Sequence, residues 1–164
     1  NQLSKKLEML EKHSLNTDLY LLTIEKKMKK GFYTNIEQET LENQNFRKVL
    51  YTARGLQLVL MALQPNEDIW AEIHHENDQF FRFESGIGEV QVNDSVYEVE
   101  DGDVIIVPAG AKHNVINTSD SELLQFYTIY SPAHHKDGVI HETKAIAEEA
   151  EENGTDEFEG ETTE

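Results

Sequence analysis

The feature that most constrains the fold is a succession of short β-type segments between residues 57 and 130. They are rich in Val, Ile, Phe and Tyr, and several alternate apolar with polar residues, as strands with one buried face do. Turn-forming pairs such as Pro65-Asn66 and Asp101-Gly102 separate them, without long helical patterns in between. This pattern predicts an all-β fold, an antiparallel sandwich or barrel. The segments are QLVLMAL, IWAEIH, QFFRFE, GEVQV, SVYEV, DVIIVP, HNVIN and LLQFYTIY.

The net charge of -18 is distributed unevenly over the 164 residues and predicts three parts. Residues 1–30 carry seven lysines and four acids, a net of +3, and their leucine spacing predicts a helical N-terminal extension. Residues 142–164 carry ten acids and one lysine, a net of -9, which predicts an acidic tail, a fraying helix followed by disorder. The β-barrel between them, residues 31–141, has a net charge of -12.

Composition also limits the partners and the chemistry. The acidic field repels nucleic acid and anionic membranes, so we expect neither as a partner. No apolar stretch approaches the roughly 20 residues that span a bilayer, and the start lacks a signal pattern, so we expect a cytoplasmic protein. Because cysteine is absent, any metal site must use histidine, carboxylate or amide ligands.

A spaced motif in the later strands is more specific. Gly102, Pro108, Gly110, His113 and Asn117 match the pattern G-x5-P-x-G-x2-H-x3-N at all five fixed positions. This run resembles the second motif of the cupin superfamily, and the resemblance covers about residues 57–131. It implies a double-stranded β-helix, that is, a jelly-roll barrel, and a homodimer, since cupins commonly dimerise through sheet edges.

The first cupin motif, G-x5-H-x-H-x3-4-E-x6-G, is matched only in part. Counting back from Gly86, Gln79 stands in place of the family's Glu, and Glu72 stands in place of the first His. Asn66 replaces the first Gly, which is a conservative exchange because Asn tolerates left-handed turns. The resemblance therefore implies a metal-ligand set of Glu72, His74, Gln79 and His113.

Strand alternation supports this ligand register and predicts a pocket. Residues two apart in a strand share a face, so Glu72 lies on the same face as His74 and as Trp70, and Gln79 on the same face as Phe81 and Phe83. Using His75 as the ligand would pair it with Ile73, which cannot coordinate a metal, so His74 is preferred. In the last strand either tyrosine could reach the pocket. The predicted substrate pocket consists of Trp70, Phe81, Phe83 and Tyr127.

Two imidazoles, a carboxylate and an amide oxygen suit one divalent metal ion, and Zn, Mn, Fe and Ni all fit this ligand set. The histidines at 134, 135 and 141 are interpreted as a solvated polar loop in preference to a second metal site.

We expect a small-molecule ligand in the barrel, and three alternative functions are compatible with it. The first is an isomerase, since short cupins of this kind are often grouped with mannose-6-phosphate isomerases. The others are a non-haem Fe or Ni dioxygenase and a non-catalytic metal- or sugar-binding module. The acidity of residues 31–141 counts mildly against a phosphosugar.

Overall fold

The computed structural model describes residues 30–164, and Tyr33–Thr163 form one unit. The predicted N-terminal extension lies, apart from Lys30, outside the described residues and stays a prediction. The elements of the described part are α2 (Ile36–Glu42), β1 (Arg47–Thr52), β2 (Gln57–Leu63), β3 (Glu72–Ile73), β4 (Asp78–Ser85), β5 (Ile87–Val92), β6 (Ser95–Glu100), β7 (Val104–Val107), β8 (Lys112–Asn117), β9 (Leu124–Ser131), β10 (Ile140–His141) and α3 (Lys144–Glu152).

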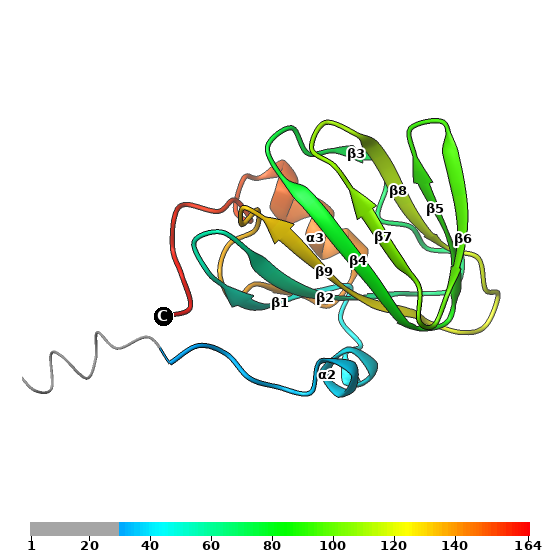
Figure 1. Ribbon diagram of the computed structural model, residues 1–164, viewed down its shortest axis with the longest axis horizontal. Coiled ribbons are helices and arrows are strands. Elements are labelled where there is room, and N and C mark those ends of the chain that lie inside the picture. The colour runs from blue at the N-terminus through cyan, green and yellow to red at the C-terminus, as the bar shows by residue number, and fades with distance from the viewer. Residues whose placement is uncertain (1–29) are drawn as a thin grey trace, which may run out of the picture. The chain divides into compact units, whose positions relative to one another are not determined.

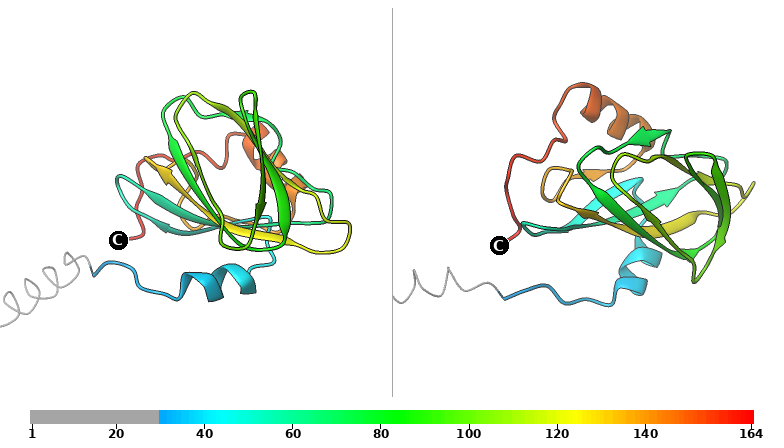
Figure 2. Two further views of the ribbon diagram at one scale, coloured as in Figure 1. Left: turned by 45° about the vertical axis from the view of Figure 1, so that its right-hand side comes forward. Right: turned by 45° about the horizontal axis from the view of Figure 1, so that its top comes forward.

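The strands form two antiparallel sheets that enclose the core, as Figures 1 and 2 show. The larger sheet has the order β10-β1-β2-β9-β4-β7, and the smaller has the order β3-β8-β5-β6. Neighbours such as β4 and β9 are far apart in the chain and pair through long crossovers. The predicted all-β jelly-roll barrel is confirmed.

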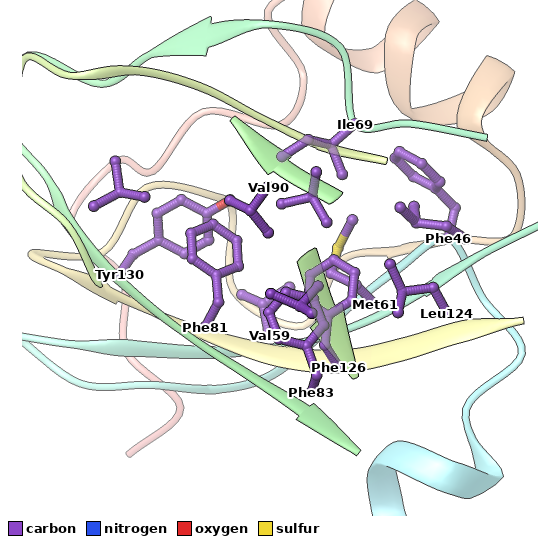
Figure 3. Packing of buried hydrophobic residues seen from close by; sticks show 14 of the residues in the cluster. Phe46, Val59, Met61, Ile69, Phe81, Phe83, Val90, Leu124, Phe126 and Tyr130 are labelled. Carbon is purple, nitrogen blue, oxygen red and sulfur yellow. The ribbon is translucent and has the colours of Figure 1, made fainter. Parts of the chain in front are cut away.

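The space between the sheets is filled by the inward residues of each strand. In β4, Phe81 and Phe83 are 1% and 0% exposed, while Phe80 and Arg82, which alternate with them, are half-buried on the outer face. Figure 3 shows how these rings pack against Phe126 and neighbouring aliphatic side chains. Burying such rings contributes roughly 2–3 kcal/mol each, so period-two alternation sets the strand register.

The segment before the first predicted strand also belongs to the fold. Helix α2 begins at Asn35, whose side chain accepts a hydrogen bond from the Gln38 amide at 3.3 Å, and it contacts β2, β4 and β9. β1 follows and pairs with both β2 and β10. In the described part of the chain, no helix is long and apolar enough to cross a membrane.

The acidic C-terminal segment differs from the predicted disorder. Helix α3 begins after Thr143, which caps it, and buries Ala147 completely in the core. Beyond the helix, Asp156 is 3% exposed and accepts a hydrogen bond from Arg47 at 2.8 Å. The composition of the segment gives its net charge, but it does not show that one of its acids pairs with a buried cation on β1. The tail is thus ordered and packs on the barrel.

Candidate metal centre

The predicted ligands come from both sheets. Glu72 in β3 is directly opposite His113 in β8, so their side chains leave neighbouring positions of the four-stranded sheet. His74 follows immediately after β3. Gln79 comes from β4 of the six-stranded sheet, where it is opposite Tyr130 of β9. The structure therefore gathers groups that are up to 41 residues apart, from His113 back to Glu72.

The donor atoms of three of these residues converge. One carboxylate oxygen of Glu72 and one ring nitrogen each of His74 and His113 all lie within 4.8 Å of one another. Glu72 Oε2 is 2.5 Å from His74 Nε2, yet this nitrogen has no hydrogen bond of acceptable geometry. His113 Nε2 is buried and equally without a partner in the described part of the chain. Three potential ligand atoms gathered this closely, two of them buried nitrogens without a hydrogen bond, are arranged as ligands of an ion are.

Gln79 adds an unusual buried amide. Its side chain is 2% exposed, and neither Nε2 nor Oε1 has a hydrogen-bond partner among residues 30–164. Leaving an amide unpaired costs about 1–3 kcal/mol, so such groups are rare in folded proteins unless a ligand or an ion satisfies them. The unpaired amide and the two unpaired imidazole nitrogens fit a bound metal ion.

The tautomer of His113 is set by its backbone neighbour. His113 Nδ1 lies 3.2 Å from the carbonyl oxygen of Ala111, and because a carbonyl only accepts, Nδ1 carries the proton. Nε2 is then left with its lone pair directed into the site, which is the form a metal requires. Burial lowers the pKa of His113 and keeps the ring neutral.

The Pro108–Gly110 turn explains why the second motif is needed at this site. The Gly110 amide donates to the carbonyl oxygen of His74 at 2.8 Å, and Gly110 has φ 82°, a conformation that other residues rarely adopt. The Ala109 amide donates to Asp78 Oδ1 at 2.8 Å. The turn thus ties the segment around His74 to the strand that carries His113.

Of the predicted pocket residues, Phe81 lies at the site, with its ring centroid 6.0 Å from that of His113. Tyr130 and His134 join it, with ring centroids 5.6 Å and 4.3 Å from His74. Strand alternation alone allows either Tyr127 or Tyr130 to face inward. Phe126 and Thr128 lie on the same face as Tyr130 and are buried, so the apolar Phe126 is the signal that could have indicated Tyr130.

The structure does not bring the other three predicted pocket residues to the site. Trp70 has φ 57°, which breaks the strand alternation, and it stacks on Phe46 with ring centroids 5.9 Å apart. Phe83 lies deeper in the core against Phe126. Tyr127 is on the outer face of the six-stranded sheet, with its ring 6.2 Å from that of Phe80.

The structure places His74, and not His75, beside Glu72. His75 is exposed, as is Ile73, whereas the His74 side chain is only 9% exposed and faces Glu72. His74 thus lies on the same face as Glu72, as strand alternation predicts, even though β3 itself is only two residues long.

The histidines after Pro132 are not a solvated loop, contrary to the sequence interpretation. His135 and His141 are 2% and 4% exposed. His135 Nδ1 lies 2.9 Å from Asp156 Oδ2, and its Nε2 lies 3.2 Å from the Tyr130 hydroxyl. Burial, followed by the charge of Arg47, lowers the pKa of His135 to about 3. No local signal in the sequence could have shown this, because Asp156 and Arg47 are distant in the chain.

A second acidic cluster, formed by His135, Glu151 and Asp156, has ligand atoms close enough for an ion. It already contains a cation, however. Arg47 Nη1 lies 2.7 Å from Glu151 Oε1 and 2.8 Å from Asp156 Oδ2. The guanidinium balances these acids, so the cluster is a buried ion-pair network and not a metal centre.

Known proteins are similar to this chain in sequence and in fold. Residues 59–130 match the family described as Cupin domain. The protein YrkC of Bacillus subtilis is 44% identical over 129 residues, which span 75% of this chain and 69% of YrkC. The crystal structure of BH2720 from Bacillus halodurans is 45% identical and has a TM-score of 0.72, covering 74% of this chain and 96% of that chain. The chain belongs to the cupin superfamily.

The similarity of this cupin to other proteins extends beyond bacilli. The protein L612 of Acanthamoeba polyphaga mimivirus is 43% identical over 112 residues, which span 66% of the cupin and 70% of L612. TT1209 from Thermus thermophilus is similar in fold alone, at 21% identity and a TM-score of 0.55, covering 61% of the cupin and 96% of that chain.

Proposed function

We propose that this cupin holds one divalent metal ion on Glu72, His74, Gln79 and His113 and acts on a small oxygen-bearing molecule in the barrel. The observation that carries the proposal is the convergence of a Glu72 oxygen with two imidazole nitrogens. The nitrogens of His74 and His113, like the buried amide of Gln79, have no hydrogen-bond partner in the described part. Nitrogen, carboxylate and amide ligands suit Zn, Mn, Fe or Ni. A bound ion of this kind polarises a carbonyl or lowers the pKa of a bound water.

The charges around the site favour a ligand without a phosphate group. An isomerase of the mannose-6-phosphate type would need a cation to hold the phosphate. Within residues 30–164, Lys112 is exposed and alternates away from His113, while Arg47 is paired with two acids. Phe81 and Tyr130 instead give the site an apolar wall. We therefore propose isomerase-type proton transfer on a carbonyl compound that carries no phosphate.

A dioxygenase is a second candidate, because the three converging residues are two histidines and one carboxylate. Open two-histidine, one-carboxylate sites are typical of non-haem Fe(II) oxygenases. Oxygen uptake by the Fe(II)-loaded cupin, measured with an oxygen electrode on a panel of small aromatic and carbonyl compounds, distinguishes the two candidates. Substrate-dependent uptake supports the dioxygenase, and proton exchange without uptake supports the isomerase.

The metal site itself is tested by elemental analysis of protein purified without added metal. We expect the wild type to contain close to one divalent ion per chain and the His113→Ala variant to contain almost none. His75→Ala is the matched control, because His75 is exposed and lies next to a proposed ligand. Equal metal content in the wild type and His113→Ala would contradict the proposal, and loss in His75→Ala alone would reverse the ligand choice.

A further inference from the structure

Two buried hydrogen bonds and one ring contact connect the C-terminal segment to the candidate metal centre. Asp156 Oδ2 lies 2.9 Å from His135 Nδ1, and His135 Nε2 lies 3.2 Å from the Tyr130 hydroxyl. The Tyr130 ring meets His74 edge-on, with centroids 5.6 Å apart. All three hydrogen-bonded residues are at most 4% exposed, so water does not compete for these contacts.

The position of each proton in these hydrogen bonds follows from its neighbours. Burial raises the pKa of Asp156, but the His135 hydrogen bond and the Arg47 charge outweigh this and lower it, so the carboxylate is ionised and only accepts. His135 Nδ1 must then carry the proton. Because the ring is neutral, its Nε2 is an acceptor. The Tyr130 hydroxyl is therefore the donor to His135, and its oxygen has only lone pairs left to offer elsewhere.

Tyr130 lies next to two of the proposed ligands, His74 and Gln79. It lies opposite Gln79 in the β4–β9 ladder, and both side chains point inward. Figure 3 shows Tyr130 beside Phe81, extending from the six-stranded sheet into the barrel.

We propose that Tyr130 is a hydrogen-bond acceptor for a hydroxyl group on the metal-bound ligand, and that Asp156, acting through His135, is the positioning residue that holds it in this role. The inference rests on the proposed metal site and deepens it by naming the ligand class. Because the phenol oxygen can only accept, a carbonyl or carboxylate oxygen of the ligand facing it would be unfavourable, whereas an O–H group of the ligand would be favourable. The ligand class is then a small hydroxy-carbonyl or hydroxy-carboxylate compound.

The tautomer is tested first, in metal-free protein, by proton–nitrogen NMR of the histidine side chains. A His135→Gln sample assigns the His135 ring signals by their absence. We expect wild-type His135 to carry its proton on Nδ1 throughout the neutral range. A proton on Nε2 would make Tyr130 an acceptor from His135 and overturn the inference, whatever the metal content of the protein.

The ligand preference is tested with the Co(II)-loaded protein. Glycolate and acetate, which differ by one hydroxyl, are titrated separately while the visible Co(II) absorption is recorded, and the ratio of their affinities is compared between variants. In Tyr130→Phe this ratio should fall about three- to tenfold, the effect of losing one hydrogen bond. Tyr127→Phe is the matched control, because Tyr127 is on the same strand and faces outward, so its ratio should equal the wild-type value.

The outcomes separate the two proposals. Stoichiometric Co(II) uptake in both variants with an unchanged ratio in Tyr130→Phe would overturn the acceptor role and leave the metal site standing. Failure of the wild type to bind Co(II) would overturn the metal site and the acceptor role with it. A further variant, Asp156→Ala, should also reduce the ratio, whereas Glu152→Ala, an exposed acid of the same segment, should not.

Discussion

Replacing Arg47 by Met removes the cation that holds the acidic segment against the barrel. The Arg47 side chain is 2% exposed and lies 2.8 Å from Asp156, which is equally buried. Its other partner, Glu151, is 35% exposed and adds little after solvent screening. Deleting one partner of a buried pair leaves an uncompensated charge and costs about 3–5 kcal/mol. Since Met recovers part of the packing of the arginine stem, we expect a loss near the lower end, about 3 kcal/mol.

Urea unfolding measures this loss directly. With a denaturant slope of about 2 kcal/mol/M, a loss of about 3 kcal/mol shifts the midpoint by about 1.5 M. Lys48→Met is the matched control on the same strand. The Lys48 side chain is 31% exposed and lies 3.8 Å from Glu39, so we expect a shift below about 0.5 M. Equal shifts in the two variants would mean that the buried ion pair does not hold the tail.

The remaining predictions concern packing and pH. Gly88→Ala should lose about 1–3 kcal/mol because a Cβ there would lie 2.6 Å from the Leu124 side chain, whereas Gly55→Ala, with nothing within 4 Å, should stay within about 0.5 kcal/mol in the same assay. Phe126→Ala should cost about 3–5 kcal/mol by thermal or urea unfolding, since the ring is fully buried. The His135 pKa of about 3 in the fold lies below the unfolded value near 6.5, so the unfolded state takes up a proton first on acidification. Stability should therefore fall between pH 6.5 and 3, by about 2 kcal/mol at pH 5, and a pH series of unfolding curves that is flat in this range would contradict it.

Much of the barrel could be predicted because period-two alternation is a local property. In QFFRFE the buried residues are the ones that alternation assigns to the same face as Gln79. Alternation failed at Trp70, where a positive φ turns the backbone and carries the side chain away from the site. A single local dihedral is not visible in a hydrophobic pattern, so the predicted pocket was wrong at that residue.

The residues of the candidate site that belong to the two motifs could be predicted, whereas the groups packed behind them could not. The motif around His113 and the partial motif before Gly86 name residues whose backbones the strand ladders bring together, as the Glu72–His113 pair shows. The groups behind them follow no motif. His135 is positioned by Asp156, 21 residues further on, and no pattern of spacing or composition indicates that contact.

The strand pattern, the barrel class and four residues with the chemistry of metal ligands can be derived from the amino-acid sequence, because alternation, turns and short motifs are all local. Only the tertiary structure decided that Tyr130 and not Tyr127 faces the site, and that the acidic tail is ordered. Both depend on contacts between distant segments, above all Arg47 on β1 with Asp156, 109 residues later. From the net charge alone, the acidic tail would be repelled by the acidic barrel. The fold, however, places one buried cation where acids of the tail can pair with it.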